Sequence, residues 1–189
     1  MKTRAHISYG RRYVAALVTV LGVLSAAQNR EASAQTLPPT LAAEAQPLRE
    51  SGAGRFRWYG LHVYDARLWV SGERYDAANP FALGLRYART FTGAAIATSS
   101  IEEMRRLGAT DATLLSRWES EMQRVFPNVA AGDDLVGLHR PRRGVAFYLN
   151  GRAIGEIADA GFAQAFFGIW LDPRTRGADL RNALLGDAR

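Results

Sequence analysis

Two kinds of hydrophobic pattern follow one another along the chain. Segments rich in aromatic, aliphatic and β-branched residues are typical of β-strands, whereas apolar residues that recur every three or four positions are typical of amphipathic helices. The strand-like segments are residues 56–60, 61–70, 82–91, 134–139 and 145–149. Asn150-Gly151 then precedes an alternating segment at 153–157, so a two-residue hairpin and one more strand are predicted there.

Helices are predicted between these strands and after them. Ser99 and Ser100 each stand three residues before a glutamate, which predicts overlapping capping boxes for a short helix that Gly108 ends. The next helix carries an apolar stripe made of Leu114, Leu115, Trp118, Met122, Val125 and Phe126. Asp159 can cap a further helix, which Pro173 stops. Its apolar positions are Phe162, Ala163, Phe166, Phe167, Trp170 and Leu171.

The order of these elements predicts an α+β fold. Strands are followed by helices, and this order occurs twice, which favours an antiparallel sheet with a helical layer on one side. Gly52-Ala53-Gly54 precedes the first predicted strand and is interpreted as a bend, because no helix pattern or third glycine follows at dinucleotide-binding spacing.

The first 34 residues differ from the rest of the chain. A basic start is followed by an apolar stretch at 14–27 and by Ala32-Ser33-Ala34, the pattern of a secretory signal peptide cleaved near Ala34. The alternative is an uncleaved anchor, although the apolar stretch is shorter than the roughly 20 residues of a spanning helix. Residues 35–51 are predicted to be a flexible lead-in and 52–189 the folded domain of an exported, periplasmic or secreted protein.

Charge and composition exclude several kinds of partner. Residues 1–34 hold five of the 24 basic and one of the 18 acidic residues, so 19 basic and 17 acidic residues remain without them and the net charge falls from +6 to about +2. This balance does not support a nucleic-acid partner. The chain has no cysteine, and its histidines, His6, His62 and His139, lack ligand spacing. We therefore expect no disulfide, no metal site and no cofactor.

Several motifs resemble one known family. The segments that carry the resemblance are 63–69, 132–134, 144–151, 166–173 and 180–186. Together they are similar to the bacterial exported branch of the chalcone isomerase-like family, over roughly residues 48 to 186. The resemblance implies the open-faced β-sandwich of that family, in which a small apolar ligand lies in a cleft between the sheet and the helices. It implies less about activity, since one fold hosts several functions.

Three residues are the candidate ligand-binding site. The alternation along 61–70 places Tyr64 on an apolar face together with His62, with Asp65 on the opposite face. The resemblance to fatty-acid-binding members implies that Tyr64 and an arginine, either Arg55 or Arg57, hold a carboxylate. Bonding of Tyr64 to a backbone carbonyl in the core, with both arginines solvated, is the structural alternative.

The resemblance argues against chalcone isomerisation. At positions where plant chalcone isomerases carry a catalytic tyrosine and an asparagine, this chain has Ile96 and Glu103. No catalytic residue is therefore assigned, and Asp133-Asp134 is interpreted as a turn rather than as an acid-base pair. The cluster Arg140-Pro141-Arg142-Arg143 is interpreted as a solvated turn, with an anionic surface such as phospholipid head groups as the alternative partner.

The leading functional hypothesis is an exported, non-enzymatic module that binds a fatty acid or a similar small apolar carboxylate. An isomerase or lyase with a rearranged site is the second hypothesis. A protein-interaction role in the cell envelope, without a small ligand, is the third.

Overall fold

The computed structural model describes Leu37 and residues 47–187. The predicted signal peptide and most of the predicted lead-in lie outside the described residues. Among those that are described, no helix is both long enough and apolar enough to span a bilayer.

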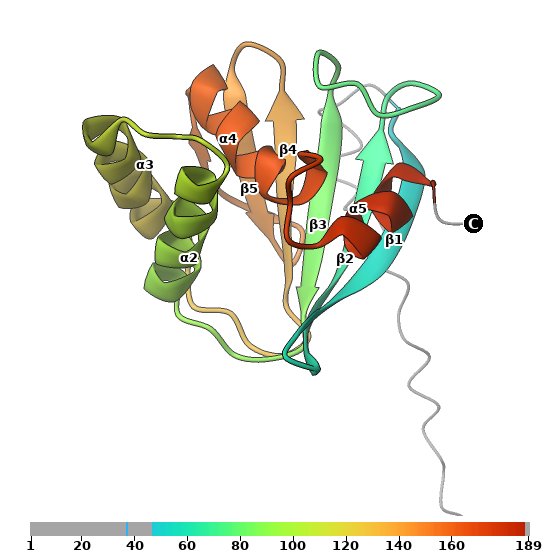
Figure 1. The fold of residues 1–189 in the computed structure, drawn as a ribbon, viewed down its shortest axis with the longest axis horizontal. Coiled ribbons are helices and arrows are strands. Elements are labelled where there is room, and N and C mark those ends of the chain that lie inside the picture. The colour runs from blue at the N-terminus through green and yellow to red at the C-terminus, as the bar shows by residue number, and fades with distance from the viewer. Residues whose placement is uncertain (1–36, 38–46, 188–189) are drawn as a thin grey trace, which may run out of the picture. The chain divides into compact units, whose positions relative to one another are not determined.

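The described part of the chain is an α+β domain built on one antiparallel sheet, as predicted (Figure 1). Six strands follow each other in sequence order across the sheet, and the segment with α2 and α3 is inserted between the third strand and the fourth. The strands are β1 (Arg49–Trp58), β2 (Leu61–Val70), β3 (Phe81–Tyr87), β4 (Asp134–Arg140), β5 (Gly144–Leu149) and β6 (Arg152–Ile157). The helices are α2 (Gly93–Arg106), α3 (Ala112–Val125), α4 (Ala160–Leu171) and α5 (Ala178–Leu185).

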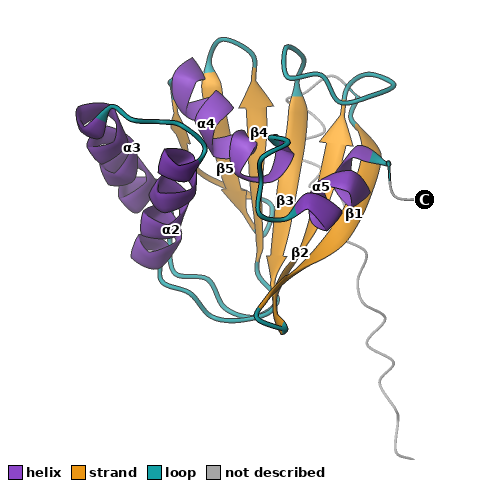
Figure 2. Ribbon diagram, in the orientation of Figure 1, coloured by secondary structure: helices purple, strands orange, loops and turns teal. Residues whose placement is uncertain are grey.

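The helices cover one face of the sheet (Figure 2). Helix α4 packs on β5, and α5 packs on β1 and β2, while α2 contacts both α3 and α4. The opposite face carries a smaller apolar cluster, which includes Trp69 and Tyr148 and is contacted by Leu37 and Leu48. The alternation of side chains in each strand therefore supplies both apolar layers.

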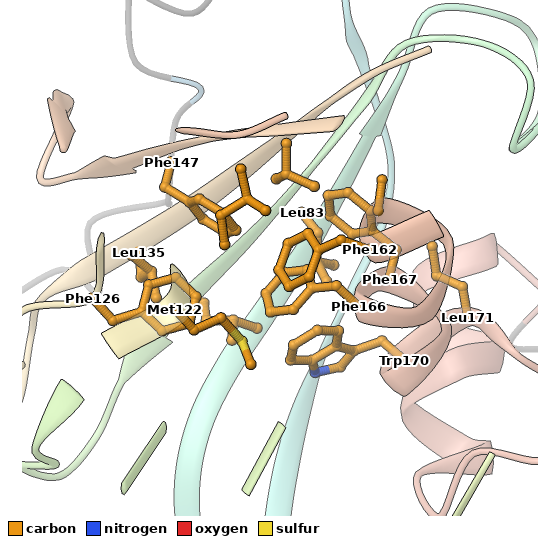
Figure 3. Packing of buried hydrophobic residues seen from close by; sticks show 14 of the residues in the cluster. Leu83, Met122, Phe126, Leu135, Phe147, Phe162, Phe166, Phe167, Trp170 and Leu171 are labelled. Atoms are coloured by element: carbon orange, nitrogen blue, oxygen red, sulfur yellow. The ribbon is translucent and has the colours of Figure 1, made fainter. Parts of the chain in front are cut away.

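The main core lies between the sheet and α4 (Figure 3). Phe162, Phe166 and Trp170 stand one helical turn apart on α4, which places them on the same side of the helix. Phe166 packs against the ring of Phe147 from β5, with 5.4 Å between the ring centroids. All these side chains are buried, as their periodicity predicts.

Local signals located several elements correctly. Asn150 and Gly151 have φ angles of 49° and 79°, the left-handed backbone that a two-residue hairpin between β5 and β6 requires. Asp159 caps α4 by accepting a hydrogen bond from the backbone N–H of Phe162 at 2.9 Å. Both predictions depend on neighbouring residues alone, which is why the sequence suffices for them.

The predicted start of the first helix was wrong. Helix α2 begins at Gly93 and is capped by Thr92, whose side chain accepts a hydrogen bond from the backbone N–H of Ala95. Ser100 lies inside this helix and donates its hydroxyl to the carbonyl oxygen of Ile96, one turn earlier. Ser99 and Ser100 are therefore interior residues of α2 and do not cap it.

Gly52 and Gly54 lie within β1 rather than in a bend before it. A Cβ atom at Gly52 would be 2.0 Å from the carbonyl oxygen of Ala183 in α5, and one at Gly54 would be 2.8 Å from Cδ1 of Leu180. Helix α5 approaches the strand backbone closely at both positions. There is no room for a side chain, and glycine is the residue that fits. The strand itself begins at Arg49, ahead of the expected start of the domain.

Candidate binding cleft

A cleft of about 420 Å³ lies between strands β1 to β4 and the helices α2, α4 and α5. Its volume falls in the range of roughly 300 to 1,000 Å³ that is usual for small-molecule sites. Most of its wall is apolar, with side chains from Phe56, Val63, Leu85, Phe91, Ile96, Leu135, Phe166, Ile169, Trp170 and Leu180. A cleft of this composition suits a mainly apolar ligand.

Tyr64 lines the cleft from β2. Its hydroxyl oxygen accepts a hydrogen bond from Nε1 of Trp170 in α4 at 3.0 Å, so the partner is a side chain and not the backbone carbonyl that was considered. The proton of the hydroxyl is not used in this bond and can be donated to a ligand. Burial raises the pKa of Tyr64 well above its ordinary value, so the phenol stays neutral near neutral pH.

Tyr87 is a second phenol in the same cleft. It is paired with Tyr64 across β2 and β3, and the two ring centroids are 6.1 Å apart. The side chain is buried, yet its hydroxyl has no hydrogen-bond partner among the described residues. Burial also raises the pKa of Tyr87 above its ordinary value, so a second neutral O–H donor is available to a ligand.

Arg55 and Arg57 do not line the cleft. They flank Phe56, which does, and the alternation of β1 therefore directs both arginines to the opposite face. Nε of Arg55 donates to Oδ1 of Asp65 at 2.8 Å, and Nη1 of Arg57 donates to the carbonyl oxygen of Gly60 at 3.3 Å. The structure thus brings Tyr64 into the cleft without either arginine.

An irregularity in the pairing of β1 and β2 decides which side chains reach the cleft. Phe56 pairs with Tyr64, but Arg57 pairs with His62, so β2 carries one extra residue at this point. Val63 and Tyr64 consequently both line the cleft. His62, which was expected beside Tyr64, instead lies 3.2 Å from Oδ1 of Asp65.

The charged groups of the cleft lie at its rim. Arg176, in the loop between α4 and α5, pairs with Glu103 of α2, with 3.2 Å between Nη1 and Oε1. The guanidinium carbon also lies 5.8 Å from the ring centroid of Trp58 on β1. About half of the Arg176 side chain is exposed, so this ion pair is screened by solvent.

Sequence reasoning missed two of the polar residues in the cleft. Tyr87 could have been found from the pairing of neighbouring strands, because it lies directly opposite Tyr64. No local pattern marks Arg176, which stands in an irregular loop after Pro173. Ile96 and Glu103, the positions at which the resemblance compares this chain with chalcone isomerases, do line the cleft.

The polar groups of the cleft can donate and accept hydrogen bonds. Its polar groups include two neutral phenols, an arginine at the rim, and the side chains of Glu102 and Glu103. Within residues 47–187 and at Leu37, no three histidine, aspartate or glutamate residues are grouped as metal ligands. Apolar contact, hydrogen bonds and the charges of these side chains are interactions that the cleft can offer a ligand.

A plant protein is among the solved structures that are similar to this chain in fold. The fatty-acid binding protein of Arabidopsis thaliana matches it with a TM-score of 0.56 and 12% identity, over 75% of this chain and 88% of that one. At such low identity, the match shows that the two proteins share a fold. It leaves the ligand of this chain open.

Sequence comparison establishes the family. A protein of Haemophilus influenzae, described as uncharacterized, is 33% identical over 139 residues, which are 73% of this chain and 68% of that protein. The family model described as chalcone isomerase-like matches residues 29–186, and this range includes the whole sheet, all the described helices and every residue of the cleft. The protein therefore belongs to the chalcone isomerase-like family.

Proposed function

We propose that this protein binds a fatty acid or a similar small apolar carboxylate in the cleft. The observation that carries the proposal is the pair of neutral phenols, Tyr64 and Tyr87, side by side in a cleft whose wall is mostly apolar. The hydroxyl of Tyr87 has no hydrogen-bond partner among the described residues, so it can donate a hydrogen bond to a ligand oxygen beside it.

The apolar wall supplies most of the affinity. An acyl chain of about ten methylenes gains roughly 8 kcal/mol on leaving water, before the costs of ordering the chain and of association. The hydroxyls then select ligands that carry an acceptor oxygen at one end. The similarity in fold to a plant fatty-acid binding protein supports this ligand class.

Arg176 is the cation that we assign to the ligand carboxylate. It is the arginine of the cleft wall, and its present partner, Glu103, also accepts a hydrogen bond from Nε of Arg106 at 2.8 Å. Glu103 therefore keeps a positive partner when Arg176 turns toward a ligand. The exposure of Arg176 limits its contribution to about 1 to 2 kcal/mol.

Titration of decanoic acid by calorimetry tests this assignment. We expect saturable binding by the parent protein and weaker binding by the variants Tyr64→Phe, Tyr87→Phe and Arg176→Gln. The tyrosine variants should each lose about 1.5 to 3 kcal/mol, since each removes a hydrogen bond to a charged group. Arg55→Ala and Arg57→Ala are matched controls, because they remove an arginine of the same sheet outside the cleft.

The controls also separate the alternatives. Decanol should bind the Arg176→Gln variant and the parent protein with equal affinity. Decanol carries no charge, so it makes no ion pair with Arg176 that the substitution could remove. A loss of binding in Arg55→Ala or Arg57→Ala would restore the original prediction for that residue. No binding, or equal binding by all the variants, would contradict the proposal and favour a protein-interaction role. Turnover of an unsaturated ketone would favour the isomerase alternative.

We further propose that the protein is exported after cleavage next to Ala34. The basic, apolar and small-residue segments of residues 1–34 support this. The intact mass of protein recovered from the periplasm or medium of an expressing bacterium should correspond to a chain that starts at Gln35. A mass that includes residues 1–34 would contradict the cleavage.

A further inference from the structure

The exposed large apolar side chains of the described residues are concentrated in one turn. They are Trp58, Tyr59 and Leu61, with exposed fractions of 43%, 90% and 56%. All three lie at the turn between β1 and β2, which is visible at the lower end of the sheet in Figure 1. An apolar cluster that a fold leaves in solvent marks a surface for a partner.

The turn holds this cluster in a defined shape. Tyr59 and Gly60 have φ angles of 46° and 80°, and the carbonyl oxygen of Gly60 accepts a hydrogen bond from Arg57. The rings of Trp58 and Tyr59 meet edge to face with 5.1 Å between centroids. The aromatic tip, Trp58 to Leu61, is therefore presented by a two-residue hairpin turn.

Positive charge flanks the aromatic tip. Arg57 is exposed and forms no ion pair among the described residues, and Arg176 lies over the ring of Trp58. The residues from Arg57 to Leu61 include no acid. Glu103 is paired with Arg176, and Asp65 with Arg55, so these acids do not cancel the charge of Arg57.

We infer that the aromatic tip docks on an anionic phospholipid surface. Tryptophan and tyrosine have an apolar ring with a polar end, so they favour the level of the lipid head groups. Arginine beside them is attracted to anionic lipids. A protein partner would be expected to meet a broader apolar patch with a polar rim, whereas a few aromatic residues at a hairpin tip suit shallow insertion.

Docking of the aromatic tip places the cleft next to the membrane. Trp58 belongs to both surfaces, since it lines the cleft and is also exposed at the tip. An apolar ligand could then pass between the bilayer and the cleft with a short path through water. This consequence rests on the proposed ligand, whereas the docking itself does not.

Tryptophan fluorescence with lipid vesicles tests the docking. Of the tryptophans, Trp69, Trp118 and Trp170 are buried, so a change on docking reports mainly on Trp58. Vesicles of phosphatidylglycerol and phosphatidylcholine should shift the emission to the blue, and brominated lipid should quench it. The Trp58→Phe variant should still sediment with the vesicles but lose most of the spectral change.

Matched variants locate the docking surface. The double variant Tyr59→Ser with Leu61→Ser should bind these vesicles at least fivefold more weakly than the parent, and Arg57→Gln should weaken binding at low salt. Arg142→Gln and Arg143→Gln are the controls, because their turn joins β4 and β5 at the opposite end of the sheet. These control variants should bind as the parent does.

Three results would overturn the inference. The first is absence of vesicle binding by a parent protein that is folded by circular dichroism. The second is binding that only Arg142→Gln or Arg143→Gln weakens, which would move the docking surface to the opposite end. The third is self-association that the double variant abolishes, without any lipid binding, which would make the tip a contact between copies. Titration of decanoic acid into the double variant in the absence of vesicles separates membrane docking from the proposed function. Binding of decanoic acid depends on the cleft, whereas binding to vesicles depends on the aromatic tip.

Discussion

The hydrogen bond between Tyr64 and Trp170 allows a quantitative test of the cleft geometry. Tyr64→Phe removes the acceptor and leaves the indole N–H of Trp170, whose side chain is buried, without its partner. A buried donor without a partner costs about 1 to 3 kcal/mol, so we expect the free energy of unfolding to fall by that amount. Urea denaturation followed by circular dichroism measures this change.

Tyr87→Phe is the matched control in the same cleft. It deletes the same atom from the paired residue, but that hydroxyl has no hydrogen-bond partner among the described residues. We therefore expect its effect on the free energy of unfolding to stay within about 0.5 kcal/mol. Equal losses in Tyr64→Phe and Tyr87→Phe, or no loss in Tyr64→Phe, would refute the assignment of the hydrogen bonds.

A double-mutant cycle completes the test. Trp170→Phe alone removes the donor, and the Tyr64→Phe with Trp170→Phe variant removes both groups. If the bond exists in solution, the second substitution should cost less when the first is already present, with a coupling of about 0.5 to 3 kcal/mol. Additive losses would show that the two side chains do not interact.

Three further predictions concern stability. Phe166→Ala should lower the free energy of unfolding by about 3 to 5 kcal/mol, because this ring packs between α4 and the sheet; a loss below about 1 kcal/mol would contradict the layer arrangement. Gly52→Ala should cost about 1 to 3 kcal/mol in the same assay, since its Cβ would meet the backbone of Ala183, and an unchanged stability would mean that α5 is not docked as described. Burial raises the pKa of Asp159, but hydrogen bonds, including one from Trp118, outweigh this and leave the pKa below its ordinary value. The carboxylate therefore stabilises the fold above about pH 4, and this contribution is lost as the pH falls through the folded-state pKa. Asp159→Asn should flatten that loss between about pH 5 and pH 2, and parallel pH profiles of parent and variant would contradict it.

The elements that local sequence predicts well are those whose signals lie within a few residues. The hairpin at Asn150-Gly151 needs only a left-handed backbone at two positions, and α4 needs only its cap at Asp159 and an apolar stripe. Helix α2 shows the limit of such signals. Ser100 fits a capping box in sequence, but its hydroxyl bonds to the preceding turn because the helix had already begun.

The sequence by itself determined the two periodicities, and through them the strands, most of the helices and the faces that they bury. Tertiary structure decided the cleft. Tyr64 and Trp170 are 106 positions apart, and Arg176 meets Glu103 only when the last loop packs beside α2. One extra residue in β2 turns His62 away from the cleft, and a strand register of this kind depends on the partner strand. Local composition specifies which face of each element is apolar, whereas the groups that meet across the cleft are set by how those faces pack together.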